Sequence, residues 1–124
     1  MLVKALRVGL GQIIVLGDAL TRGRPQRRSA EGQARVAKEA ANLSLYQFHA
    51  CPFCVKTRRA IHRLNVPIAL YDAKNDAARR EKLLAGGGKV KVPCLHIQED
   101  GKSTWMYESN TIIKYLETRF ASIT

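Results

Sequence analysis

The sequence predicts an α/β domain whose elements follow the order β-α-β-α-β-β-α around a small mixed sheet. Three observations predict this class. Short apolar segments typical of strands recur from residue 43 onward. Longer segments between them repeat their apolar residues at helical spacing. Turns that contain Gly, Asp or Pro separate the segments. We therefore expect a folded domain over residues 44–124, preceded by an N-terminal helical extension over residues 1–43.

The first expected strand covers residues 43–48, which alternate as a strand does. A helix is expected over residues 52–64, because Pro52 suits a first helical turn. The apolar residues that fall on one side of this helix are Val55, Ile61 and Leu64. A second strand is expected over residues 66–71, where apolar residues dominate again.

The second half of the domain is expected to begin with a helix over residues 76–84, which the glycines at 86–88 end. Two strands are expected over residues 92–97 and 104–107, on either side of a turn that contains Asp100. A last helix is expected over residues 109–120. Its expected buried residues are Ile112, Ile113, Tyr115, Leu116 and Phe120.

Residues 1–43 are expected to hold an amphipathic helix and a basic linker. The apolar stretches within residues 1–20 are too short for a spanning helix. Three interpretations of this helix stay open: it docks on its own domain or on a partner, it lies in a membrane interface, or it is a cleaved signal peptide. Residues 30–41 are expected to form a short surface helix.

The composition is that of a globular protein, with 46% hydrophobic and 25% charged residues. Three cysteines are a low and odd count, which argues against a disulfide-stapled secreted scaffold. The net charge of +11 attracts anions. Nucleic acid is not an expected partner, because no aromatic residues interleave with the basic ones as a stacking platform requires. Peripheral membrane contact through residues 1–28 stays open.

Cys51 and Cys54 form a Cys-x-x-Cys pair where the first expected strand gives way to a helix. A helix N-terminus stabilises negative charge, so Cys51 is expected to be a thiolate that attacks disulfides. Cys54, one turn into the helix, is expected to stay protonated and to resolve the resulting mixed disulfide. Such a pair at this position indicates redox chemistry.

Zinc binding is the alternative use of the pair, with His49, Cys94 and His96 as further ligands. The Cys-x-His spacing of that second half is unusual for zinc, and Pro52 favours the redox interpretation, so we expect no metal. Cys94 is expected to be a small buried hydrophobe; a third redox or metal-binding sulfur is the alternative.

Three motifs together resemble the glutaredoxin family and the related N-terminal thioredoxin-fold domain of glutathione transferases. They are Tyr46-Gln-Phe-His-Ala-Cys-Pro-Phe-Cys54, Val92-Pro93, and Glu108-Ser109 before the closing helix. The resemblance covers residues 44–121. It implies a thioredoxin-like, glutaredoxin-type fold with a four-stranded mixed sheet and a redox-active disulfide between Cys51 and Cys54.

The resemblance also implies a glutathione site. Val92 and Pro93, as a cis peptide, would offer the backbone of Val92 to the cysteinyl part of glutathione. Glu108 and Ser109 would hold its γ-glutamyl end at a helix N-terminus. Three further residues would complete the site, each with a plainer alternative: Phe53 (partial core), His49 (a surface histidine) and Lys91 (a solvated lysine). Helix capping is the simpler role for Ser109. His49 stands near a position where glutaredoxins often carry a Lys.

The activity that the resemblance implies is a glutathione-dependent thiol–disulfide oxidoreductase. Its substrates would be protein disulfides or glutathionylated proteins, with glutathione as co-substrate. The alternative is a module that binds glutathione, or a glutathione-ligated [2Fe–2S] cluster, without strong reductase activity. A third possibility is a membrane-tethered adaptor in which residues 1–43 matter more than the thiols. Glutathione dependence points to the cytoplasm, and contact with the inner membrane surface stays open.

Overall fold

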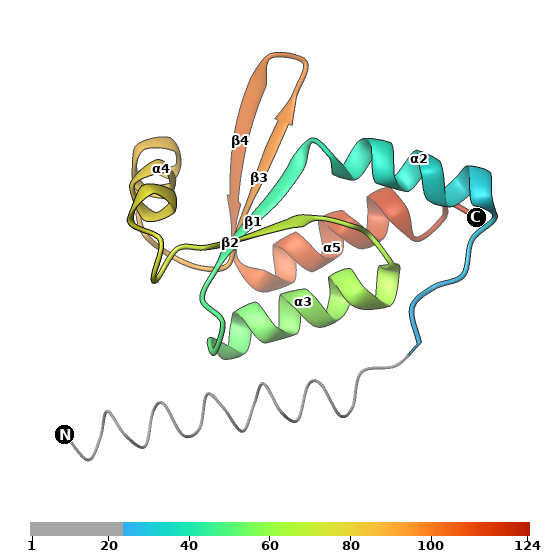
Figure 1. Ribbon diagram of the computed structural model, residues 1–124, viewed down its shortest axis with the longest axis horizontal. Helices are drawn as coiled ribbons and strands as arrows, with labels where there is room; N and C mark the ends of the chain where they lie inside the picture. Colours follow the sequence, from blue (N-terminus) through green and yellow to red (C-terminus); the bar gives the residue numbers. More distant parts are fainter. Residues whose placement is uncertain (1–23) are drawn as a thin grey trace.

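The computed structural model describes residues 24–124, so the helix expected within residues 1–20 lies outside the described residues (Figure 1). The described residues form helices and strands in the order α2 (Ala30–Ala40), β1 (Leu43–Gln47), α3 (Pro52–Leu64), β2 (Ala69–Asp72), α4 (Ala77–Gly87), β3 (Cys94–Glu99), β4 (Lys102–Tyr107) and α5 (Ser109–Phe120). Over this part of the chain, none of the helices is long and apolar enough to cross a membrane.

The four strands form a mixed sheet in the order β2-β1-β3-β4. β1 runs parallel to β2, while β1 and β3, and β3 and β4, pair antiparallel. This arrangement confirms the expected α/β class and the thioredoxin-like fold. The two-residue turn between β3 and β4 contains Asp100 and Gly101, both at positive φ (53° and 73°), as a tight hairpin requires.

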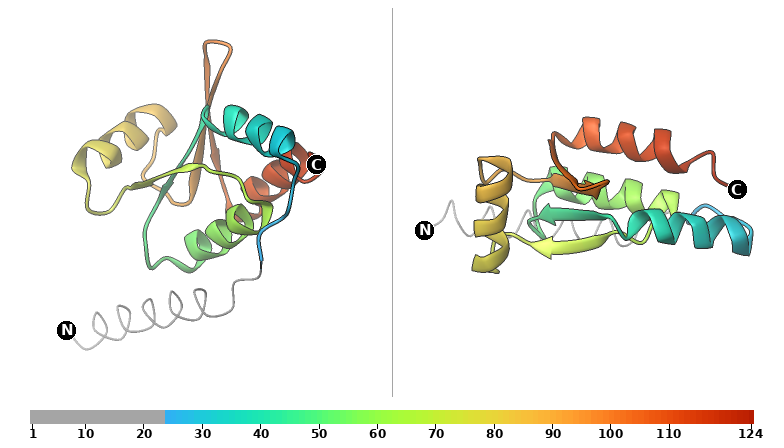
Figure 2. Two further views of the ribbon diagram at one scale, coloured as in Figure 1. Left: turned by 45° about the vertical axis from the view of Figure 1, so that its right-hand side comes forward. Right: turned by 90° about the horizontal axis from the view of Figure 1, so that it is seen from above.

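Helices cover the two faces of the sheet unequally (Figures 1 and 2). α3 and α5 lie side by side, whereas α4 stands apart from them. The strands alternate accordingly, because successive side chains point to opposite faces. Leu45 and Leu95 join the larger core with α3 and α5, and Tyr46 and Cys94 join a second cluster with Leu83 of α4. The remaining buried residues of the larger core are Val36, Ala40, Leu43, Ile61, Leu64, Val66, Ile68, Ile97, Ile112, Leu116, Phe120 and Ile123.

The bounds of α3 and α5 agree with expectation, and the other elements differ by a few residues at one end or both. β2 begins at Ala69 because the segment before it contains Pro67, which has no N–H for a ladder. β3 begins at Cys94, after the cis Val92–Pro93 peptide. α4 continues to Gly87 instead of ending at residue 84, and Gly88 caps it at φ 85°.

The glycines within α4 allow the helix to approach β4 closely. A Cβ on Gly86 would lie 2.2 Å from Cζ2 of Trp105, and a Cβ on Gly87 would clash with the hydroxyl of Tyr107. The Tyr107 hydroxyl donates to the carbonyl of Lys89, 2.9 Å away, just after the helix. The glycine run therefore permits packing as well as helix termination.

α2 is more deeply packed than a surface helix. Ser29 caps its N-terminus by accepting the N–H of Gly32 at 3.1 Å, and Val36 and Ala40 are buried in the larger core. Arg28 ties the preceding segment to the C-terminal end of α5, donating to the carbonyls of Ile123 and Phe120 at 2.7 and 2.9 Å. Within the described residues, the part of the chain before residue 44 therefore shares one core with the domain that follows it.

Candidate active site

The register of the sheet brings the expected site residues to one edge. Tyr46 of β1 lies opposite Cys94 of β3, and Cys94 lies opposite Tyr107 of β4. Because these neighbours are antiparallel, β1 and β4 end at the edge where β3 begins. The loop to α3, the Val92–Pro93 peptide and the start of α5 therefore leave the sheet beside one another.

Cys51 is the N-cap residue of α3, and Pro52 begins the helix as expected. The Cys51 side chain is half-buried and makes no capping hydrogen bond. Its N–H donates to the carbonyl of Phe48 at 3.3 Å, and its carbonyl accepts the first helical bond, from Val55 N–H, at 2.9 Å. Cys51 thus stands at the N-terminal end of α3 with a sulfur that solvent can partly reach.

Cys54 is fully buried, one turn further along α3. Burial raises the pKa of the Cys54 thiol to about 12, and the neighbouring Cys51 adds to the increase. The N–H of Phe48 lies 3.4 Å from Cys54 Sγ and favours its thiolate, but burial outweighs this contact. Cys54 is therefore protonated at neutral pH in the folded protein, as its position in the helix predicts.

Arg58 belongs to this site and was missed by the sequence analysis. Its guanidinium donates to the carbonyl of His49 at 2.6 Å, to the carbonyl of Phe48 at 3.4 Å, and to the side-chain oxygen of Gln47. These acceptors belong to the end of β1 and the loop before Cys51. A signal was present in the sequence, because Arg58 is spaced three residues from both Val55 and Ile61 on the apolar side of the helix.

The residues expected at the glutathione site lie around this edge. The Val92–Pro93 peptide is cis, as expected. Glu108 is exposed at the N-cap of α5, and Ser109 is buried in the first turn. Lys91 Nζ donates to Glu108 Oε1 at 2.8 Å, and this hydrogen bond holds the pKa of the Glu108 carboxyl below its usual value. Lys91 is thus paired with Glu108, the residue that immediately precedes α5.

The N-termini of α3 and α5 are joined directly, because Lys56 Nζ donates to Asn110 Oδ1 at 2.5 Å. Phe53 is 62% exposed, so it is not part of the core and is free to cover a ligand. His49 is also exposed, in the loop that Arg58 holds. The site is consequently an open, largely polar edge with one exposed aromatic ring.

Cys94 and His96 point to the opposite side of the domain. Both are buried in or beside the α4 cluster, where burial raises the pKa of Cys94 to about 11. The imidazole of His96 stacks on Trp105 with 3.9 Å between ring centroids. Among residues 24–124, no group of three or more His, Cys, Asp or Glu side chains is arranged to hold a metal ion.

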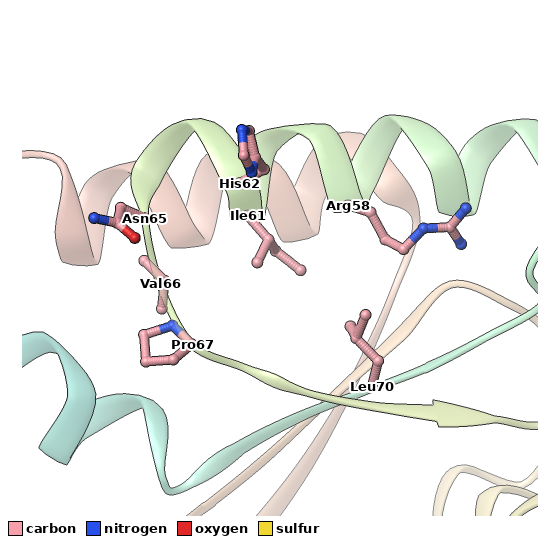
Figure 3. A pocket seen from close by; sticks show the side chains of 7 residues that line it. All are labelled: Arg58, Ile61, His62, Asn65, Val66, Pro67 and Leu70. Carbon is pink, nitrogen blue, oxygen red and sulfur yellow. The ribbon is translucent and has the colours of Figure 1, made fainter. Parts of the chain in front are cut away.

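A separate pocket of about 270 Å³ lies between the second half of α3 and β2 (Figure 3). Its lining residues are Arg58, Ile61, His62, Asn65, Val66, Pro67 and Leu70. The Cys-x-x-Cys pair does not line it. Figure 3 shows the Arg58 side chain at one end of this pocket, extending away from Asn65.

Fold and site together define a thioredoxin-like domain with a Cys-x-x-Cys pair at the N-terminus of its first helix after β1. Residues 45–122 match the family "Glutathione S-transferase, N-terminal domain", and the chain belongs to this family. Glutaredoxin 2 of Escherichia coli strain K12 is 31% identical over 75 residues, which is 60% of this chain and 33% of that protein. The chain thus spans about a third of the length of this curated relative.

Two solved structures share the fold at low sequence identity. Glutathione transferase Omega 3C from Trametes versicolor has a TM-score of 0.54 and 20% identity, covering 80% of this chain and 43% of that one. Maleylacetoacetate isomerase from Anaeromyxobacter dehalogenans 2CP-1, solved with bound GSH, has a TM-score of 0.51 and 20% identity, covering 65% and 38%. At this identity the likeness supports the fold alone.

Proposed function

We propose that this domain is a glutathione-dependent thiol–disulfide oxidoreductase that reduces protein disulfides or protein–glutathione mixed disulfides. The observation that carries the proposal is the contrast between the two sulfurs of one motif. Cys51 is half-buried at a helix N-terminus, whereas Cys54 is fully buried with its pKa raised to about 12. Cys51 is thus placed to attack a disulfide, and Cys54 to resolve the mixed disulfide that forms.

The first step is a thiol–disulfide exchange at Cys51. Its thiolate attacks the glutathione sulfur of a protein–glutathione mixed disulfide, so the Cys51–glutathione bond forms and the protein sulfur leaves and takes up a proton. A second glutathione thiolate then attacks the glutathione sulfur on Cys51, which releases oxidised glutathione. Alternatively, Cys54 loses its proton and attacks Cys51, which closes a disulfide and releases reduced glutathione.

Glutathione itself would lie along the sheet edge. The cis Val92–Pro93 peptide directly precedes β3, at the end of the sheet where β1 leads into the Cys51 loop, and Ser109 begins α5, where N–H groups favour a carboxylate. Lys91, Glu108, Phe53 and His49 are the surrounding side chains that we assign to the ligand. The match to the glutathione S-transferase N-terminal domain supports glutathione as the ligand class, and the isomerase that shares the fold holds bound GSH.

The test compares Cys51→Ser with Cys54→Ser. We expect Cys51→Ser to abolish reduction of a peptide–glutathione mixed disulfide by glutathione, because Cys54, the other thiol of the motif, is fully buried. Cys54→Ser is expected to keep a large share of this activity, since a second glutathione completes the cycle. The readout is release of oxidised glutathione under steady-state conditions.

Cys94→Ala is the matched control, because it removes a buried thiol that faces α4. It should leave the rate unchanged. Equal activity of Cys51→Ser and the unmodified protein would exclude the assignment of Cys51 as nucleophile.

A further inference from the structure

Arg58 is a buried cation placed beneath the Cys51 loop. It is 8% exposed, on a helix whose other basic residues are mostly at the surface. In Figure 3 its side chain extends from α3 away from the end of the helix at Asn65, and therefore toward the end that carries Cys51. Its bonds to the carbonyls of Phe48 and His49 fix two consecutive peptides of the loop.

The Phe48 peptide connects Arg58 to both active-site cysteines. Its carbonyl accepts from Arg58 and from the N–H of Cys51, at 3.4 and 3.3 Å. The N–H of Phe48 in turn donates to Cys54 Sγ, at 3.4 Å. A shift of this short loop would therefore move the backbone of Cys51 and the hydrogen bond of Cys54 at once.

We propose that Arg58 is a positioning residue that, by holding the Phe48 peptide, sets how readily Cys51 and Cys54 close into a disulfide. The inference rests on the proposed function, because it concerns the same two sulfurs. In ring closure, the Cys54 thiol loses a proton and its sulfur bonds to the sulfur of Cys51. The Cys51–glutathione bond breaks, and glutathione leaves as a thiolate that takes up a proton.

Two physical effects connect Arg58 to ring closure. The effective concentration of one thiol at another depends steeply on their relative position, so a fixed loop favours the Cys51–Cys54 disulfide at equilibrium. The positive charge of Arg58 favours the Cys54 thiolate and partly offsets the increase in pKa that burial causes, which speeds the attack of Cys54 without favouring the disulfide at equilibrium. A second glutathione completes the cycle without ring closure.

The experiment measures the equilibrium constant between the reduced protein and its Cys51–Cys54 disulfide in mixtures of reduced and oxidised glutathione. Arg58→Met, which keeps chain length and removes charge and donors, should lower the constant for closure about tenfold. Arg58→Lys, which retains the charge but lacks the fork of donors, should restore part of this loss. In a Cys54→Ser background, adding Arg58→Met should change monothiol turnover by a smaller factor than it changes the closure constant, because that cycle needs no ring closure.

Arg28→Met is the matched control, because Arg28 also donates to main-chain carbonyls, but at the C-terminal end of α5. It should lower thermal stability without moving the glutathione equilibrium, which separates positioning from general destabilisation. If Arg58→Met does not fold, Arg58→Lys alone decides, with an expected shift of about threefold.

An equilibrium constant that is unchanged in the folded Arg58 variants would overturn the proposal. So would an equal shift in Arg28→Met. If the unmodified protein forms no Cys51–Cys54 disulfide with oxidised glutathione and has no thiol activity, the proposed function itself has failed. That outcome differs from failure of the Arg58 proposal alone, in which the disulfide forms normally and its equilibrium constant is the same in the Arg58 variants.

Discussion

His96 is a buried titratable residue on the α4 side of the sheet. It is 4% exposed, and its Nε2 lies 3.1 Å from Ser103 Oγ. Burial lowers the pKa of His96 below its usual value of 6.5, and the charge of Lys82 adds to the effect. His96 therefore binds a proton less readily in the folded protein than in the unfolded chain.

Stability should consequently fall as the pH drops below about 6.5, because the unfolded state binds more protons there. The contribution of His96 is present at higher pH and is lost at up to about 1.4 kcal/mol per pH unit until the folded imidazole also titrates. Urea unfolding followed by circular dichroism between pH 5 and 8 measures this slope. His96→Gln should reduce the slope; a slope equal to that of the unmodified protein would refute the assignment.

Single residues could be predicted from the sequence where their chemistry depends on chain-local features. The positions of Cys51 and Cys54 at the start of a helix follow from the motif and from Pro52, and the structure has them there. The cis peptide at Val92–Pro93 came from a resemblance and was confirmed. Arg58 was missed because its acceptors belong to a strand end and a loop, which no helical periodicity describes.

At the scale of elements, α4 depends on the absence of a side chain at Gly86. Alanine in a helix interior is normally favoured over glycine by about 1 kcal/mol. Here the added Cβ would meet the Trp105 ring, so we expect Gly86→Ala to destabilise the protein by about 1–3 kcal/mol. Chemical denaturation measures the loss. In a Trp105→Leu background the same change should become neutral or stabilising; stabilisation in the unmodified background would contradict the packing role.

Element boundaries were predictable where local signals and periodicity agree, as Pro52 and the apolar spacing do in α3. They were not predictable where a neighbour decides. α4 runs through Gly86 and Gly87 because β4 accepts a close helix, and β3 starts late because Pro93 precedes it. The burial of Val36 in α2 likewise depends on strands and helices distant in sequence.

At the scale of the whole molecule, Arg119 in the last turn of α5 joins three elements. Its guanidinium donates to both carboxylate oxygens of Glu99 at the end of β3, at 2.5 and 2.8 Å. It also lies 3.7 Å from the carboxylate of Glu39 in α2. The hydrogen bond from Arg119 lowers the pKa of Glu99, so this link stabilises the protein above about pH 4.5 and weakens as the pH falls further.

Arg119→Met should therefore cost about 1–3 kcal/mol at pH 7, and less at pH 3, which lies below the usual glutamate pKa of 4.5, where the contribution of the pair is being lost. Arg63→Met is the matched control, because its pair with Glu117 is exposed on both sides and should be worth about 0–1 kcal/mol. Urea unfolding at the two pH values measures the loss of unfolding free energy in each variant. Equal losses of unfolding free energy in the two variants would show that the contacts of Arg119 stabilise the protein no more than an exposed ion pair does.

The order and class of the whole fold followed from the sequence because each strand and helix has its own pattern. The sheet register did not, yet it is the register that places residues 46, 94 and 107 in one row and assembles the site. The sequence also did not predict that residues 24–42 contribute to the same core. This segment is mostly polar, and only two of its residues, Val36 and Ala40, are buried in the core.

The close contact between Gly86 and Trp105 has a practical consequence. Trp105 is the sole tryptophan of the chain, and its indole is stacked on His96 while α4 rests against it. Fluorescence excited at the long-wavelength edge of the protein absorption band therefore comes from Trp105. Its emission wavelength and lifetime give an optical readout of whether α4 is seated, without any added label.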